Sequence, residues 1–174
     1  MGVPRRLTDI RWSDWVAKDQ ATLVFVVRDG QVLLIRKKRG LGAGKINGPG
    51  GKLEPGESSR DCAVREVREE LGIVPLGLRL SGENSFQFLD GYAIHVHVYL
   101  AEAFEGTPVE TEEAIPHWFP LDAIPYAEMW EDDWIWLPLV FHHEPFSGRF
   151  LFDGDKMLDW SLQRQERGDV GLEV

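Results

Sequence analysis

The chain has 174 residues, 43% of them hydrophobic, which suits a single domain with a sizeable core. Its formal net charge of −10 argues against duplex DNA or RNA as a partner, because phosphate backbones need a basic surface. A small anionic nucleotide is not excluded, since metal ions and a few cations suffice to bind one.

The sequence carries no membrane or secretion signal. No apolar run approaches the ~20 residues that span a bilayer, and the N-terminus lacks a secretory apolar segment. Cys62 is the only cysteine, so no intramolecular disulfide can form, and we interpret it as a packing residue rather than a nucleophile. We therefore expect a soluble, cytoplasmic protein.

The first part of the chain predicts an extension and a hairpin. Residues 1–20 precede the first strand, and we expect them to pack through Trp12 and Trp15, with no function assigned. The segment ATLVFVVRDGQVLLIRKK predicts a β-hairpin, because two apolar runs meet at an Asp-Gly turn. The loop RGLGAGK and a glycine-rich stretch follow.

A helix is predicted at about residues 58–71. Ser58 or Ser59 can serve as its N-cap, and Gly72 lies where a C-terminal cap is expected. One helical face carries an apolar stripe that can dock on a core, formed by Ala63, Val67 and Leu71.

The rest of the chain predicts more strands than helices. In chain order we expect a hairpin of residues 76–89 and 92–103, a short strand IPHWFP, two short helices within residues 121–144, and a final hairpin of GRFLFDG and KMLDWSL. We divide the chain into an extension of residues 1–20, a domain of residues 21–165 and a frayed tail of residues 166–174.

The predicted helix is strongly acidic on its other face. Glu66, Glu69 and Glu70 are spaced i, i+3, i+4, which brings them within roughly 5–6 Å of one another. Such charges repel unless something neutralises them, and Mg²⁺ does so while leaving positions open for phosphates. Arg65 can pair with Glu57 or with Glu69. The alternative is a solvated acidic surface.

A longer pattern favours the metal site. Gly51, five residues, Glu57, seven residues and then REVREELGI match every fixed position of the box of Nudix (MutT-like) hydrolases. This resemblance implies an α/β fold, the Nudix α/β/α sandwich with a mixed central sheet, whose box helix carries the metal site. It also implies Mg²⁺-dependent cleavage of a nucleoside diphosphate linked to another moiety, with Mn²⁺ able to substitute.

Segments outside the box resemble one subfamily. KKRGLGAGKINGPGGK, EGTPVETEEAIPHWFPLDAIPYAEMWEDDWIWLPL and FDGDKMLDWSL are similar to oxidised purine nucleoside triphosphatases, also called 8-oxo-dGTP diphosphatases, over residues 21–164. The resemblance implies a monomer that converts oxidised purine triphosphates to the monophosphate and pyrophosphate, and so cleanses the nucleotide pool. Other readings are a Nudix hydrolase acting on ADP-ribose or dinucleoside polyphosphates, and a non-catalytic nucleotide-binding module.

The resemblance also implies roles for individual residues. The metal ligands it implies are Gly50, Gly51, Glu66, Glu69, Glu70 and Glu113, with Glu57 and Arg65 completing the catalytic set. The substrate residues it implies are Lys37 near the phosphates, and Thr22, Asn47, Trp130, Asp132 and Asp133 around the base. One of the two neighbouring aspartates is expected to hold a proton and act as a donor.

Three positions of the predicted pocket and two histidines of a predicted strand also bear on the site. Leu41, Ile46 and Pro49 depart from the subfamily pattern, which carries aromatic residues at these positions, so the pocket can differ in shape and stack more weakly on the base. His95 and His97 alternate along a strand and share a face, but two ligands fall short of the four of a structural zinc site. We expect them to be ordinary sheet residues or to line the cavity.

Overall fold

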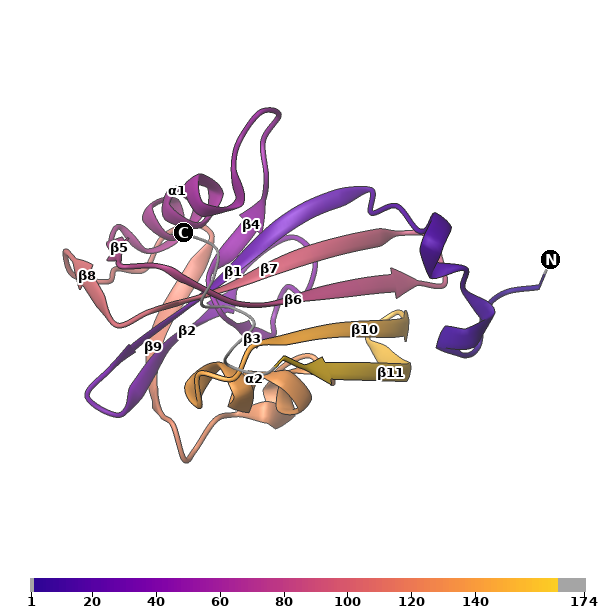
Figure 1. Ribbon diagram of the computed structural model, residues 1–174. Coiled ribbons are helices and arrows are strands. Elements are labelled where there is room, and N and C mark those ends of the chain that lie inside the picture. Colours follow the sequence, from indigo (N-terminus) through magenta and orange to yellow (C-terminus); the bar gives the residue numbers. More distant parts are fainter. Residues whose placement is uncertain (1, 166–174) are drawn as a thin grey trace.

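The computed structural model describes residues 2–165 and shows a sheet between two helices (Figure 1). The helices are α1 (Ser59–Leu71) and α2 (Asp133–Phe141), and 3₁₀ turns occur at Leu7–Asp9, Trp12–Asp14 and Tyr126–Glu128. The strands are β1 (Asp19–Arg28), β2 (Gln31–Lys37), β3 (Ile46–Asn47), β4 (Gly50–Lys52), β5 (Val74–Leu76), β6 (Arg79–Phe88), β7 (Ala93–Ala101), β8 (Ala103–Glu105), β9 (Ala114–Pro120), β10 (Phe146–Asp153) and β11 (Lys156–Arg164).

The main sheet is mixed, as expected. Its path is β11-β10-β6-β7-β1-β2-β3, with β4 paired to β1 and β9 to β2. The pairs β1–β7 and β6–β10 are parallel, and the others are antiparallel. The three predicted hairpins are confirmed as β1–β2, β6–β7 and β10–β11. At the first turn Asp29 and Gly30 have φ of 54° and 73°, the left-handed pair of a tight hairpin.

Two strands, β4 and β2, pair with successive parts of β1. Residues Ala21–Leu23 pair with β4, whereas Val26–Arg28 pair with β2. Between them the Val24 amide donates to the Pro49 carbonyl at 2.8 Å. A Cβ at Gly50 would lie 1.9 Å from the Thr22 carbonyl oxygen, so this close approach requires glycine.

Helix α1 covers one face of the sheet, within the predicted bounds. The Ser58 hydroxyl accepts from the Asp61 amide at 3.1 Å, and Gly72 ends the helix at φ 73°. Ser58 is therefore the N-cap of the two candidates. The predicted stripe is fully buried and packs with β1 and β2 through a core of Ala63, Val67, Leu71, Val24, Val26, Leu33 and Ile35.

Helix α2 covers the opposite face, so the α/β/α sandwich is confirmed (Figure 1). Trp136 packs against Phe25 and Phe146, with ring centroids 5.7 Å away in both cases. Of the two short helices expected in residues 121–144, the first is only the 3₁₀ turn Tyr126–Glu128. None of the helices among residues 2–165 has the length and hydropathy that crossing a bilayer requires.

The N-terminal segment is packed on the sheet. The Trp15 indole donates to Gln87 Oε1 and the Leu7 amide donates to Asp159 Oδ2, both at 2.8 Å. The guanidinium of Arg149 lies 4.8 Å from the Trp12 ring. Strand β1 begins at Asp19, two residues before the predicted start. The tail expected at residues 166–174 lies outside the described residues.

The docking of α1 can be tested by its stability. Leu71 has no exposed surface, so Leu71→Ala should lower the free energy of unfolding by about 2–5 kcal/mol. The matched control Arg68→Ala, on the exposed side of the same turn, should change it by less than about 0.5 kcal/mol. Urea denaturation measures both, and equal effects would contradict the packing described.

Candidate active site

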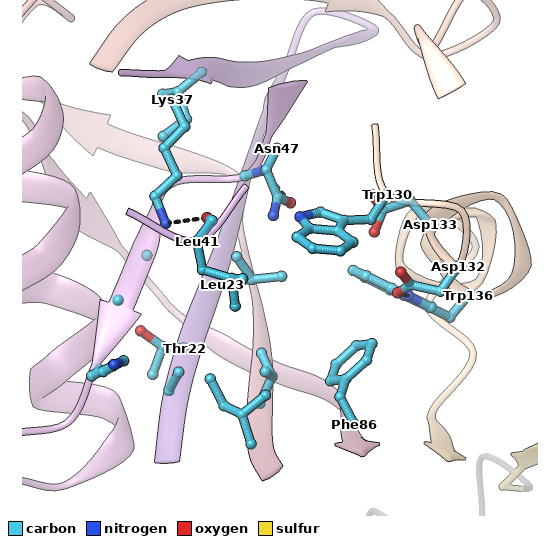
Figure 2. A pocket seen from close by; sticks show the side chains of 18 of the residues that line it. Thr22, Leu23, Lys37, Leu41, Asn47, Phe86, Trp130, Asp132, Asp133 and Trp136 are labelled. Atoms are coloured by element: carbon cyan, nitrogen blue, oxygen red, sulfur yellow. Dashed lines mark hydrogen bonds between the residues drawn. The ribbon is translucent and has the colours of Figure 1, made fainter. Parts of the chain in front are cut away.

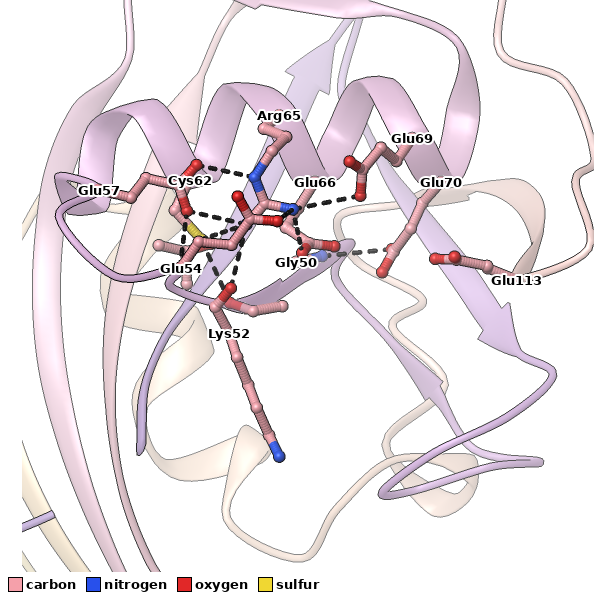
Figure 3. A network of polar contacts seen from close by, with 12 residues as sticks. Gly50, Lys52, Glu54, Glu57, Cys62, Arg65, Glu66, Glu69, Glu70 and Glu113 are labelled. Carbon is pink, nitrogen blue, oxygen red and sulfur yellow. Dashed lines mark hydrogen bonds and ion pairs between the residues drawn. The ribbon is translucent and has the colours of Figure 1, made fainter. Parts of the chain in front are cut away.

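An acidic cluster forms where α1 meets the loop before β9. Carboxylate oxygens of Glu66, Glu70 and Glu113 lie within 4.8 Å of one another (Figure 3). Glu70 is buried, and its Oε2 accepts from the Gly50 amide at 3.3 Å. A Cβ at Gly51 would lie 2.4 Å from the Glu66 carboxyl carbon, so a side chain at residue 51 would displace that carboxyl group.

The environment of the acidic cluster disfavours negative charge. Burial raises the pKa of Glu70 to about 8, with Glu66 and Glu113 adding to the effect through repulsion. Burial also raises the pKa of Glu66. A hard divalent cation prefers carboxylate oxygens and supplies the missing positive charge. The acidic cluster therefore fits a divalent metal ion.

Arg65 fixes the carboxylates beside the acidic cluster. Its guanidinium holds both oxygens of Glu57, at 2.7 and 2.8 Å, and reaches Glu66 Oε1 at 2.8 Å (Figure 3). It also contacts Glu69 Oε2 at 3.2 Å, so both partners left open by the sequence occur. This pairing lowers the pKa of Glu57 to about 2. Glu69 thus lies with Arg65, outside the group of three oxygens.

Both the side chain and the backbone of Glu113 are held by residues that follow β2. Its carboxylate pairs with Arg39 at 2.5 Å, and its carbonyl accepts from the Lys38 amide at 3.0 Å. The Thr111 hydroxyl donates to the Glu70 carbonyl at 2.8 Å, which ties this loop to α1. Residues far apart in the chain are thereby fixed around one point.

A pocket of about 150 Å³ extends from Glu70 of the acidic cluster to Trp136 of α2. Figure 2 shows the side chains of Thr22, Asn47 and Trp130 around it. All six predicted substrate residues line it, namely Thr22, Lys37, Asn47, Trp130, Asp132 and Asp133. Gly50, Gly51 and Glu70 line it too, so one cavity joins the metal-ligand candidates to the base-binding candidates. The Thr22 hydroxyl lies 3.5 Å from Cys62 Sγ of α1, and Lys37 Nζ donates to the Leu41 carbonyl at 2.9 Å.

Trp130 is held at one wall of the pocket. Phe88 and Phe152 contact it edge to face at 6.2 and 5.6 Å between centroids. Lys45 Nζ lies 5.3 Å from its ring, and Gly42 leaves room for the indole nitrogen. A ring fixed in this way is suited to stacking on a planar base.

The two aspartates differ in their partners. Asp132 Oδ2 accepts from the Trp136 indole at 2.7 Å, whereas Asp133 Oδ2 is buried with no hydrogen-bond partner among the described residues. Burial raises the pKa of Asp132 to about 6, and burial and the neighbouring Asp132 raise that of Asp133 well above its usual range. One of them can therefore be a neutral carboxylic acid at neutral pH, and so a donor.

The sequence did not identify the apolar walls of the pocket. These are formed mainly by Leu23, Phe86, Phe88, Ile94, Val96, Trp136 and Phe152. Alternation along β6 and β7 signals that such residues share a face, but not which face meets the pocket. Of the three departures from the subfamily pattern, Leu41 lines the pocket, and Ile46 and Pro49 do not.

His95 and His97 do not line the cavity, contrary to one of the two expectations. Ile94 and Val96, which alternate with them on β7, do line it. Side chains alternate across a strand, so the histidines point to the opposite face of the sheet.

Comparison with known proteins agrees with this geometry. The NUDIX domain family model matches residues 17–140. Proteins named oxidized purine nucleoside triphosphate hydrolase are 44% identical in Danio rerio, over 83% of this chain and 94% of that one, and 45% identical in Mus musculus, over 82% and 92%. A MutT protein structure from Bacillus halodurans superposes with a TM-score of 0.74 at 29% identity, covering 83% of this chain and 97% of that one. The chain belongs to the Nudix family.

Proposed function

We propose that this protein hydrolyses oxidised purine nucleoside triphosphates such as 8-oxo-dGTP to the monophosphate and pyrophosphate, and so cleanses the nucleotide pool. The observation that carries the proposal is the continuous pocket, because it joins Trp130, Asp132 and Asp133 to Gly50 and Glu70. Two relatives whose names give oxidised purine triphosphates as substrates, at 44% and 45% identity, support it.

The metal ion proposed for the acidic cluster is Mg²⁺, with Mn²⁺ able to replace it. Glu66, Glu70 and Glu113 would hold it, with Gly50 and Gly51 providing close backbone. Bound there, Mg²⁺ would neutralise phosphate charge and ease attack on phosphorus. Arg65 would position Glu57 and Glu66 for this task.

The remaining steps fall to side chains of the chain itself. A water attacks one phosphorus atom of the α–β bridge, and the bond between that atom and the bridging oxygen breaks, which separates the monophosphate from pyrophosphate. A glutamate accepts the proton of the water, and Glu69, Glu70 and Glu113 are the candidates. Lys37, which lines the pocket, would balance phosphate charge.

Base recognition would use both aspartates. Trp130 stacks on the purine, and the amide of Asn47 can donate and accept. A neutral Asp133 would donate to an acceptor on the base edge, while Asp132 accepts from an N–H group. Such a pair can bind either oxidised guanine or oxidised adenine. Thr22 would close the same cavity near α1.

The organisation of the chain is proposed on the same grounds. We take residues 21–165 as the catalytic domain and residues 1–20 as an extension. One chain supplies every proposed site residue, which supports a working monomer. Burial raises the pKa of Cys62 to about 11, in keeping with an inert thiol in a cytoplasmic protein. The charge of −10 supports free nucleotides, rather than nucleic acid, as substrates.

A substrate panel tests the proposed function. Hydrolysis with Mg²⁺, measured by chromatographic separation of the nucleotide products, should be fastest with oxidised purine triphosphates, compared with plain dNTPs, ADP-ribose and diadenosine polyphosphates, and chelation of the metal should abolish it. Faster turnover of ADP-ribose or a dinucleoside polyphosphate would assign another Nudix activity, and no turnover of any substrate would indicate a binding module.

The role of the box glutamates can be tested with isosteric variants. Glu69→Gln and Glu70→Gln keep the shape but remove a charge, so kcat/KM should fall by about 10²–10⁴-fold while the circular dichroism spectrum is unchanged. The control Glu112→Gln alters an exposed neighbour of the acidic cluster and should leave activity intact. A double Glu69→Gln, Glu70→Gln variant that stays active would rule out the mechanism.

The aspartate pair can be tested through substrate preference. Asp132→Asn and Asp133→Asn fix one donor–acceptor pattern, so the ratio of kcat/KM for oxidised guanine and oxidised adenine triphosphates should shift by about tenfold, the worth of one to two hydrogen bonds. Asp122→Asn, an exposed control, should leave the ratio unchanged. Equal losses on both substrates would show that the pair does not select the base.

A further inference from the structure

A second cluster of metal-ligand side chains lies on the sheet face opposite the pocket. We call it the histidine cluster; it consists of His95 and His97 on β7 and Glu83 on β6. Glu83 is paired directly with His97 in the antiparallel register of the two strands. All three side chains are partly exposed, by 43% for Glu83, 23% for His95 and 19% for His97, so an ion can reach them from solvent.

The ligand atoms of the histidine cluster converge on one point. Glu83 Oε1 lies 2.9 Å from His97 Nδ1 and 3.5 Å from His95 Nε2, and the three ligand atoms lie within 4.8 Å of one another. Zinc bonds of about 2.0–2.2 Å in a tetrahedron place neighbouring ligand atoms about 3.3–3.6 Å apart. Small side-chain movements therefore suffice to enclose an ion.

The other nitrogen of each imidazole is already engaged. His95 Nδ1 lies 2.9 Å from the Ser85 hydroxyl, and His97 Nε2 lies 3.0 Å from Gln20 Oε1. Hydrogen bonds of this kind orient metal-binding histidines and fix which nitrogen faces the metal. Because Gln20 Oε1 only accepts, His97 Nε2 is the donor. His97 Nδ1 is then the nitrogen that faces Glu83, at 2.9 Å from Oε1.

No other cation competes for the carboxylate in the described part of the chain. The ion pairs of Glu83 involve His95 and His97 alone, with no lysine or arginine. An imidazole nitrogen that faces a carboxylate can carry a proton or bind a divalent ion, so a metal ion can occupy the space between these three groups.

We propose that Glu83, His95 and His97 form a binding site for a borderline-soft divalent metal of the zinc class, with the fourth position left to water. Its two nitrogen ligands distinguish it from the acidic cluster, whose three oxygen ligands suit Mg²⁺. The site is independent of nucleotide hydrolysis, and its occupancy would link β6 to β7.

Calorimetry on the untagged full chain tests this site. Titration with Zn²⁺ in millimolar Mg²⁺, which keeps the acidic cluster occupied, should show one binding event per chain. The double variant His95→Asn, His97→Asn should lose that event and keep its Mg²⁺-dependent pyrophosphate release. The control His117→Asn, an exposed histidine on β9, should bind as the parent does. An unchanged zinc event in the double variant, or none in the parent, would overturn the proposal.

Two further readouts separate a built site from chance coordination. Co²⁺ in place of Zn²⁺ should give the visible absorption of a four-coordinate nitrogen–oxygen site, and Glu83→Gln should remove it. Gln20→Ala touches no ligand atom, yet it should weaken zinc binding by about 10–100-fold because His97 loses its orienting partner. An unchanged affinity in Gln20→Ala together with a six-coordinate Co²⁺ spectrum would show that surface histidines bind the ion adventitiously.

Discussion

The crowding of carboxylates against a glycine backbone is the constraint on which the rest of this molecule depends. Glu70 is buried beside Glu66 and Glu113, and burial raises the pKa of both helix glutamates. Without a cation this arrangement would cost stability, since buried like charges repel and lose hydration. Gly51 leaves the space that the Glu66 carboxyl group occupies, and Gly50 allows its backbone to approach that of Thr22. The fold therefore keeps an arrangement that a divalent ion completes.

The division of β1 between β4 and β2 lies beside both the acidic cluster and the pocket. Gly50 and Thr22, whose backbones approach closely, both line the cavity, which also reaches Trp136 of α2. Asp132 and Trp130 line the same cavity as Glu70. One nucleotide can therefore place its triphosphate at the acidic cluster and its purine at Trp130. The acidic cluster and the pocket therefore meet where β1 changes its partner from β4 to β2.

The long strands and the helix α1 were predictable, because their hydrophobic patterns repeat several times along the sequence. The three hairpins and α1 follow from turn dipeptides, alternation and caps. The short strands β3 and β4, of two and three residues, have no period to detect. Helical spacing placed Glu69 with Glu66 and Glu70, but it could not show that Glu69 contacts Arg65 and lies outside the group of three close oxygens. The apolar pocket walls depend on which face of each strand meets α2.

The histidine cluster could not be predicted from the sequence alone either. Two histidines on one strand face are visible in the sequence, but their third ligand depends on the register of β6 and β7. That register shifts between Leu80 and Gly82, and a shift by one residue would turn Glu83 to the other face. No local pattern specifies such an irregularity.

The most direct test of the account is a crystal structure with Mn²⁺ and a non-hydrolysable 8-oxo-dGTP analogue. We expect anomalous density within bonding distance of Glu66 and Glu70 and of the phosphates, with the purine against Trp130. A triphosphate bound with those carboxylates turned away from it, or a base outside the pocket, would contradict the account.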